Sequence, residues 1–281
     1  MHRHTFTGTF LNVISCCCSK TTNLNQSQIS CRGGAGCGAL ICGLHLFYKA
    51  DNSDNVRLEE LKRSIGKLQE RGILVKLSYG GDEWGNLDVY EKTASMARTN
   101  ADVMARTIEE LGLDGIDLVQ QQGYGSDNMN ADNLSSIQLY FLKYLRSLLP
   151  TKLISYTFPG YKSVIDFPFR DVIQYGHQYL NTVNVFRGQM DTIQALNSEY
   201  GVPKSKMILG LAIGCNQNPF EDVDLAKAIN YTEFVKNEGL AGIMTWSLNR
   251  DTDHRTDEYC NELQTGQPDG TFLETIIETL Q

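Results

Sequence analysis

Eight short apolar runs alternate with longer amphipathic segments along this 281-residue chain, and this alternation limits the possible fold more than any other feature. Short apolar runs bounded by turn residues are typical of buried strands, whereas apolar residues that recur every three or four positions indicate helices. The predicted strands are residues 10–15, 39–47, 73–79, 115–119, 153–158, 182–186, 207–213 and 241–247. The clearest predicted helices are residues 56–71, 89–111, 135–149 and 272–280.

This repeated strand–helix order predicts the α/β class and a (β/α)8 TIM barrel. We expect a single domain over residues 1–281, in which residues 1–38 contain the first strand and a Cys-rich loop. The short connections between the later strands predict that no small domain is inserted. A doubly wound open sheet is the alternative, but the first strand-to-helix turn lacks the G-x-G-x-x-G pattern of the dinucleotide-binding folds.

The overall charge restricts the class of partner. The formal net charge is −8 and the sequence pI is about 5.2. An acidic chain is repelled by the negative charge of nucleic acid and of an anionic membrane surface. In addition, no apolar run approaches the length of about 20 residues that a membrane-spanning helix needs. We therefore expect neither a nucleic-acid partner nor a membrane partner.

Cysteines are concentrated near the N-terminus. Six of the eight lie within the first 42 residues, namely Cys16, Cys17, Cys18, Cys31, Cys37 and Cys42. Their spacing lacks the paired C-x-x-C units of a zinc site, so neither a metal nor another cofactor is predicted. The sequence is compatible with disulfides between these cysteines and also with buried free thiols. The N-terminal stretch is broken by Thr9 and Asn12 and shows no A-x-A pattern, so it does not form a convincing signal peptide.

Three predicted strand ends carry unusual motifs. The active site of a TIM barrel is built at the carboxyl ends of its strands, so these positions are informative about function. The motifs are Ser78–Gly81 (SYGG), Asp114–Gln121 (DGIDLVQQ) and Gly242–Ser247 (GIMTWS).

In this order and spacing, the motifs resemble those of the chitinase-like proteins of glycoside hydrolase family 18. The family pattern S-x-G-G matches residues 78–81, the first half of D-G-x-D-x-D-x-E matches residues 114–117, and G-x-M-x-W matches residues 242–246. The resemblance implies a TIM barrel that binds chito-oligosaccharides or other N-acetylglucosamine-containing glycans. It also implies secretion, since members of the family are secreted.

The chain departs from the family where the family's catalytic residues stand. In that family the substrate's own N-acetyl group is the nucleophile, and the last Glu of the strand-four motif is the acid. The resemblance places Gln121 at the position of this acid and Val119 at the position of the Asp that orients the acetamide. An amide cannot donate a proton as a general acid, and valine offers no hydrogen bond. Asp114 and Asp117 are what remains of the motif.

A further pair of substitutions falls on the sixth strand. The family pattern Met-x-Tyr-Asp aligns with Phe186–Gln189, so Gly188 and Gln189 stand where the family has Tyr and Asp. These coordinated losses predict a pseudoenzyme with no catalytic residues.

Several residues near the predicted strand ends remain suited to binding a sugar. An aromatic platform would come from Trp246, Trp84 and Tyr124, because aromatic faces cover the apolar side of a pyranose ring. Polar contacts to the hydroxyl groups would come from Gln121, Arg187, Gln189 and Asn249. With only two tryptophans in the chain, we expect a shallow cleft and a short ligand.

Two other functions remain open. The chain could be an active hydrolase whose acid has moved to Asp82, Glu83 or Asp251. Alternatively, the barrel could have lost sugar binding and serve as a scaffold or inhibitor with a protein partner. A sugar titration beside a turnover assay separates these functions.

Overall fold

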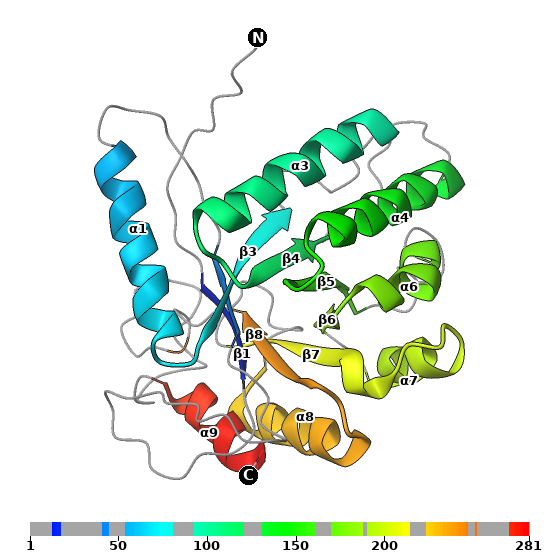
Figure 1. Ribbon diagram of the computed structural model, residues 1–281. Helices are drawn as coiled ribbons and strands as arrows, with labels where there is room; N and C mark the ends of the chain where they lie inside the picture. The colour runs from blue at the N-terminus through cyan, green and yellow to red at the C-terminus, as the bar shows by residue number, and fades with distance from the viewer. Residues whose placement is uncertain are drawn as a thin grey trace, which may run out of the picture.

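The computed structural model of the 281-residue chain describes residues 13–17, 41–44, 54–80, 93–120, 131–160, 170–187, 190–213, 223–246, 251 and 270–280. The strands lie in the middle of the molecule and the helices surround them (Figure 1). The strands are β1 (Val13–Cys17), β2 (Ile41–Leu44), β3 (Leu74–Gly80), β4 (Gly115–Val119), β5 (Leu153–Pro159), β6 (Thr182–Phe186), β7 (Met207–Ala212) and β8 (Gly242–Trp246). The α-helices are α1 (Asp54–Gln69), α3 (Ala94–Glu110), α4 (Ala131–Leu148), α6 (Arg170–Gly176), α7 (Met190–Ser198), α8 (Leu225–Glu238) and α9 (Thr271–Leu280).

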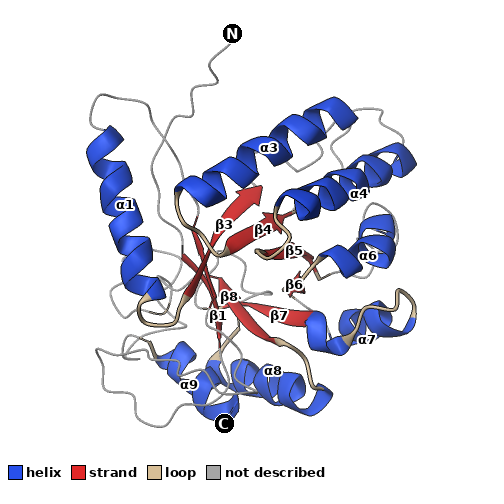
Figure 2. Ribbon diagram, in the orientation of Figure 1, coloured by secondary structure: helices blue, strands red, loops and turns tan. Residues whose placement is uncertain are grey.

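The sheet is parallel through most of its width. From β3 to β8, each strand pairs in parallel with the next strand in the chain, and β2 pairs in parallel with β3. Strand β1 pairs with both β2 and β8 and so closes the ring. A helix follows each strand from β3 to β8 and covers the outside of the sheet (Figure 2). The predicted α/β class and its curved parallel sheet with outer helices are confirmed.

The first strand departs from the prediction of eight parallel strands. Strand β1 runs antiparallel to both of its neighbours. A parallel neighbour would require a crossover connection of about a dozen residues or more, which is usually a helix. Residues 18–40, which connect β1 to β2, carry no amphipathic helical period in the sequence. The expected (β/α)8 pattern therefore does not extend to the first strand.

Alternating side chains divide the interior into two parts. On β4, Ile116 and Leu118 belong to the large apolar core between the sheet and the helices. Because successive side chains of a strand point to opposite faces, Asp117 and Val119 face the inside of the ring. All four side chains are buried. The inside of the ring is therefore a separate environment from the outer core, and the site described below lies there.

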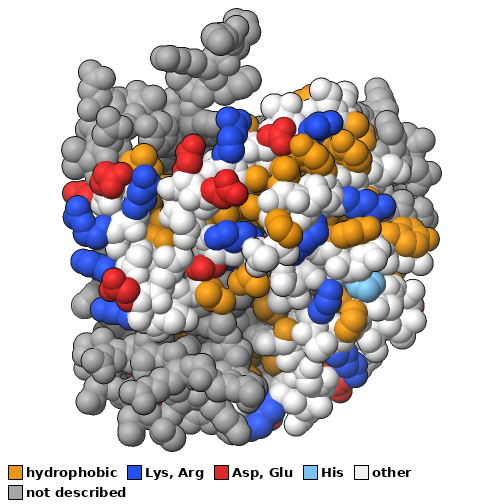
Figure 3. All heavy atoms as spheres, in the orientation of Figure 1, with side chains coloured by type: hydrophobic (Ala, Val, Ile, Leu, Met, Phe, Trp, Pro, Cys, Tyr) orange, Lys and Arg blue, Asp and Glu red, His pale blue; other side chains and the backbone are white. Residues whose placement is uncertain are grey.

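The helices present a mixed surface to solvent. Helix α3 buries Ala97, Ala101, Met104 and Ile108 against the sheet, while Tyr144 of α4 donates a hydrogen bond to Asp102 of α3. Basic and acidic side chains are interspersed on the face in Figure 3. In the described part of the chain, no helix is both long and apolar enough to cross a membrane.

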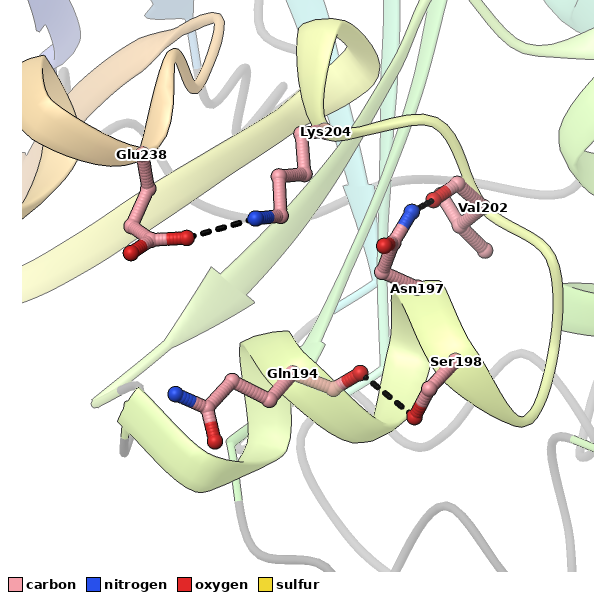
Figure 4. Close-up of polar contacts among 6 residues, drawn as sticks. All are labelled: Gln194, Asn197, Ser198, Val202, Lys204 and Glu238. Carbon is pink, nitrogen blue, oxygen red and sulfur yellow. Dashed lines mark hydrogen bonds and ion pairs between the residues drawn. The ribbon is translucent and has the colours of Figure 1, made fainter.

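Polar contacts hold the connection that leads from α7 into β7. Asn197 Nδ2 donates to the carbonyl of Val202 at 2.9 Å (Figure 4). Lys204 Nζ then pairs with Glu238 Oε2, at the end of α8, at 2.6 Å. These contacts fix the start of β7, at the end of the sheet opposite to the carboxyl ends of the strands.

Gly115 allows β4 and β5 to approach closely. A Cβ atom on Gly115 would lie only 2.0 Å from the carbonyl oxygen of Leu153, its partner on β5. Backbone cannot move aside as a flexible side chain can, so any larger residue here must push the strands apart. This requirement explains the glycine in the D-G-x-D motif. By contrast, apart from its chain neighbours and the backbone of its own helix, Gly66 in α1 has no atom within 4 Å of the position that a Cβ would take.

These two glycines give a matched test. Gly115→Ala should lower the free energy of unfolding by about 1–3 kcal/mol, the usual cost of overpacking. Gly66→Ala should raise it by up to about 1 kcal/mol, because alanine is the better helix former. Urea denaturation followed by circular dichroism measures both values. A Gly115→Ala protein as stable as the unmodified chain would contradict the proposed close approach.

Candidate functional site

Strands β3 to β6 place a cluster of polar side chains inside the ring. The buried members are Lys76 and Ser78 of β3, Asp117 of β4, Ser155 and Thr157 of β5, and Asn184 of β6. Each lies on the inward face of its strand, and the parallel register brings Ser78, Asp117 and Ser155 side by side. A polar cluster this deep is stable only when its members are hydrogen-bonded to one another.

Asp117 is the acceptor at the centre of this cluster. Its side chain is 2% exposed. The Ser155 hydroxyl donates to Oδ1 and the Thr157 hydroxyl lies 2.9 Å from Oδ2. Asn184 Nδ2 donates to Oδ1 at 3.1 Å and to Thr157 Oγ1 at 2.9 Å. The carboxylate is thus fixed by donors from two neighbouring strands.

The orientation of the Asn184 amide follows from these contacts. Both acceptors of its Nδ2 belong to the Asp117–Thr157 pair, and turning the amide over would place an oxygen against the carboxylate. Its Oδ1 is buried and has no hydrogen-bond partner within the described residues. Such an acceptor is suited to a buried water molecule.

Val119 occupies the next inward position of β4, one step closer to the carboxyl end. It is 3% exposed and lies in register with Gly80 on one side and Thr157 on the other. On β4, an apolar side chain therefore lies between Asp117 and the carboxyl end of the strand. Gln121, which comes two residues later, lies outside the described residues.

The opposite side of the ring is apolar. Phe186, Ile208, Ala212 and Met244 form a small buried cluster, and Trp246 packs against it. The rings of Phe186 and Trp246 meet edge to face with their centroids 6.2 Å apart. Trp246 is the last residue of β8 and is half-buried. It therefore lies at the carboxyl end of the strands, on the rim of the apolar cluster.

Arg187 lies at the same end, immediately after β6. Its φ of 54° is in the left-handed region, which is unusual for a residue other than glycine. The guanidinium carbon lies 5.3 Å from the centroid of the Phe186 ring. Thus the structure brings two of the predicted ligand-binding residues, Arg187 and Trp246, to the same phenylalanine.

Asp114 holds β3 to β4. Its Oδ2 accepts hydrogen bonds from the Val75 backbone N–H at 2.8 Å and from Gln69 Nε2 at 3.0 Å. It lies before β4, at the opposite end of the strand from the rim, and so serves the architecture of the sheet.

Asp251 was one candidate for a relocated acid, and in the structure its carboxylate contacts the start of α9. The side chain is 4% exposed, and its two oxygens accept the backbone N–H groups of Phe272 and Leu273 at 3.0 and 2.9 Å. Both oxygens are therefore engaged at the first turn of α9, where unpaired N–H groups favour a carboxylate. Asp251 therefore caps the first turn of α9.

The remaining predicted site residues lie outside the described part of the chain. They are Trp84, Gln121, Tyr124, Gln189 and Asn249, together with the other two candidate acids, Asp82 and Glu83. Their roles stay predictions. Four polar residues of the site were not predicted from the sequence: Lys76, Ser155, Thr157 and Asn184. The alternation of side chains that placed Asp117 and Val119 on the inward face of β4 also places these residues on the inward faces of β3, β5 and β6.

Sequence comparison with known proteins identifies a distant relative of this chain. No protein-family model matches the sequence. The chain is similar to an endo-beta-N-acetylglucosaminidase of Flavobacterium sp. (strain SK1022), with 26% identity over 203 residues that cover 70% of this chain. The matched part spans 60% of the length of that relative.

Solved structures show the same fold. Group II chitinase catalytic domain 2 of Ostrinia furnacalis, a mutant in complex with penta-N-acetylchitooctaose, has a TM-score of 0.65 and 16% identity over 83% of this chain and 84% of its own. The apo endo-beta-N-acetylglucosaminidase of Cordyceps militaris has a TM-score of 0.60 and 16% identity over 86% and 80%. A double mutant of the Cordyceps enzyme was solved in complex with fucosyl-N-acetylglucosamine-Asn. These neighbours share the curved parallel sheet with outer helices that the resemblance to glycoside hydrolase family 18 implies.

The cap formed by Asp251 can be tested by mutation. Asp251→Ala removes the acceptor of two buried N–H groups and should lower the free energy of unfolding by about 1–2 kcal/mol. Asp224→Ala is the matched control, because Asp224 caps α8 through a single exposed contact to Lys227 N, at 2.7 Å. We expect the smaller loss there. Equal stability of Asp251→Ala and the unmodified protein in urea would contradict the assignment.

Proposed function

We propose that this chain is a catalytically inactive, chitinase-like protein that binds N-acetylglucosamine-containing glycans, such as chito-oligosaccharides, without hydrolysing them. The observation that carries the proposal is Val119. It occupies the inward position above Asp117 on β4, buried and apolar, where the resemblance expects a carboxylate.

The chemistry of an acid supports the absence of hydrolysis. A general acid must carry a proton and reach the glycosidic oxygen. Asp114, Asp117 and Asp251 all accept hydrogen bonds from neighbouring groups of the fold. Gln121, at the expected position of the acid, has no proton to donate near neutral pH.

The rim of the ring supports the binding of a sugar. Trp246 is half-buried at the end of β8 and is held by Phe186, so its ring would need little reordering to receive a pyranose. The Ostrinia and Cordyceps structures, which share the fold, were solved with N-acetylglucosamine-containing ligands. Binding without turnover is thus the function that fits both Val119 and Trp246.

We expect binding without cleavage in solution. Isothermal titration with chitotetraose should give saturable binding of modest affinity, since a short ligand on a shallow site gains only a few tenths of a kcal/mol per non-hydrogen atom. A chromogenic chitobioside incubated with the same protein should release no product above the blank. Product above the blank would contradict inactivity, and no saturable response at millimolar sugar would favour the scaffold hypothesis.

Two aromatic variants locate the binding site. Trp246→Ala should weaken the binding of chitotetraose at least tenfold, or about 1.4 kcal/mol. Tyr140→Ala is the control, because Tyr140 is an exposed aromatic residue on the outer helix α4. The affinity of this variant for chitotetraose should stay within threefold of that of the unmodified protein. Circular dichroism must first show that both variants fold. Equal effects of the two substitutions would contradict a site at the rim.

Restoring the two carboxylates tests why activity is absent. Gln121→Glu together with Val119→Asp should produce measurable hydrolysis of chitobioside, whereas Gln121→Glu alone should produce little. The acid needs a neighbour that sets its protonation and holds the acetamide in line. Gly188→Tyr and Gln189→Asp complete the set. If the full set folds and still binds chitotetraose but remains inert, the missing carboxylates do not explain the inactivity.

A further inference from the structure

Lys76 is a lysine inside the ring. It is 3% exposed, on the inward face of β3, in register with Gly115 of β4. Lysine is almost never fully buried without a partner, because removing an ammonium group from water is costly. Its Nζ lies 2.5 Å from Ser155 Oγ. In an apolar strand pattern, such a residue calls for a physical explanation.

The hydrogen-bond donors around Asp117 are arranged in one direction. An ammonium group can only donate, so Ser155 Oγ accepts from Lys76 and must give its own proton to Asp117. In the same way, Thr157 Oγ1 accepts from Asn184 Nδ2 and gives its proton to the carboxylate. Both hydroxyl groups are thus polarised toward Asp117, as expected around an anion.

We infer that Lys76 is the internal counter-ion of Asp117, acting through the Ser155 hydroxyl. Val119, the next inward residue of β4, carries no charge. Lys76 of β3 is the cationic member of the buried cluster that surrounds Asp117. Lys76 is therefore a positioning residue: through Ser155 it holds the Asp117 carboxylate in place, and Asp117 in turn orients Thr157 and Asn184. This inference depends neither on sugar binding nor on catalytic activity.

A purely packing role for the lysine stem predicts different behaviour. If only the stem matters, Lys76→Met should be nearly neutral, because methionine fills a similar volume. If the charge matters, Lys76→Met leaves an uncompensated carboxylate, and Asp117→Asn leaves an uncompensated ammonium group. Breaking a buried pair on one side is costly, whereas removing both charges together is often neutral.

The experiment is a double-mutant cycle on the full chain. We expect Lys76→Met and Asp117→Asn each to lower the folding equilibrium constant by about 100-fold or more. The double variant should be more stable than either single variant, because no unpaired charge remains. Urea denaturation measures all four proteins. Additive losses, or a Lys76→Met protein as stable as the unmodified chain, would overturn the inference.

Two controls keep the result interpretable. Lys152→Met is the matched lysine, since Lys152 Nζ donates to the Leu113 carbonyl at 2.7 Å and is only partly buried; combined with Asp117→Asn it should show no coupling beyond threefold. If a single variant at Lys76 or Asp117 fails to fold, the double variant decides the outcome. Recovery of native circular dichroism in the double variant supports the counter-ion, and its failure to recover contradicts it.

Discussion

Burying the Asp117 carboxylate inside a ring of strands is the constraint on which the surrounding structure depends. A carboxylate so placed must receive hydrogen bonds from every side that lacks water. Ser155 and Thr157 of β5 and Asn184 of β6 supply these bonds, and Lys76 of β3 closes the network. The network links four consecutive strands through their inward faces, so a slip of one residue in any of them would turn its polar group out of the ring. The carboxylate therefore favours one register of β3 to β6 over the others.

The fold by itself does not decide what chemistry the chain performs. A TIM-type barrel hosts many functions, and activity is decided by the residues at its carboxyl rim. Here the lower part of the ring keeps a polar cluster, whereas the position above it on β4 is the apolar Val119. Across the ring, Phe186 and Met244 support Trp246 at the rim. Under the proposed function, Trp246 at the rim would hold a sugar, and the missing carboxylates would leave that sugar uncleaved.

The sequence predicted the elements better than the contacts between them. Strands Gly115–Val119 and Thr182–Phe186 begin and end where the apolar runs placed them, because turn residues bound both runs closely. The direction of β1 was not predictable, since it depends on pairing with β8 at the far end of the chain. Lys76 was also missed: it interrupts an apolar run, and its partner Ser155 lies 79 residues away. Val119 and Trp246, in contrast, could be placed at inward positions from the alternation of side chains and the strand-end motifs.

Native mass spectrometry of the protein mixed with chitotetraose tests the central claim most directly, because one spectrum reports both the complex and the sugar released from it. The account predicts a complex of one protein chain with an intact tetrasaccharide, and a free sugar pool that contains only the tetrasaccharide after prolonged incubation. Accumulation of the disaccharide or trisaccharide in that pool would contradict it.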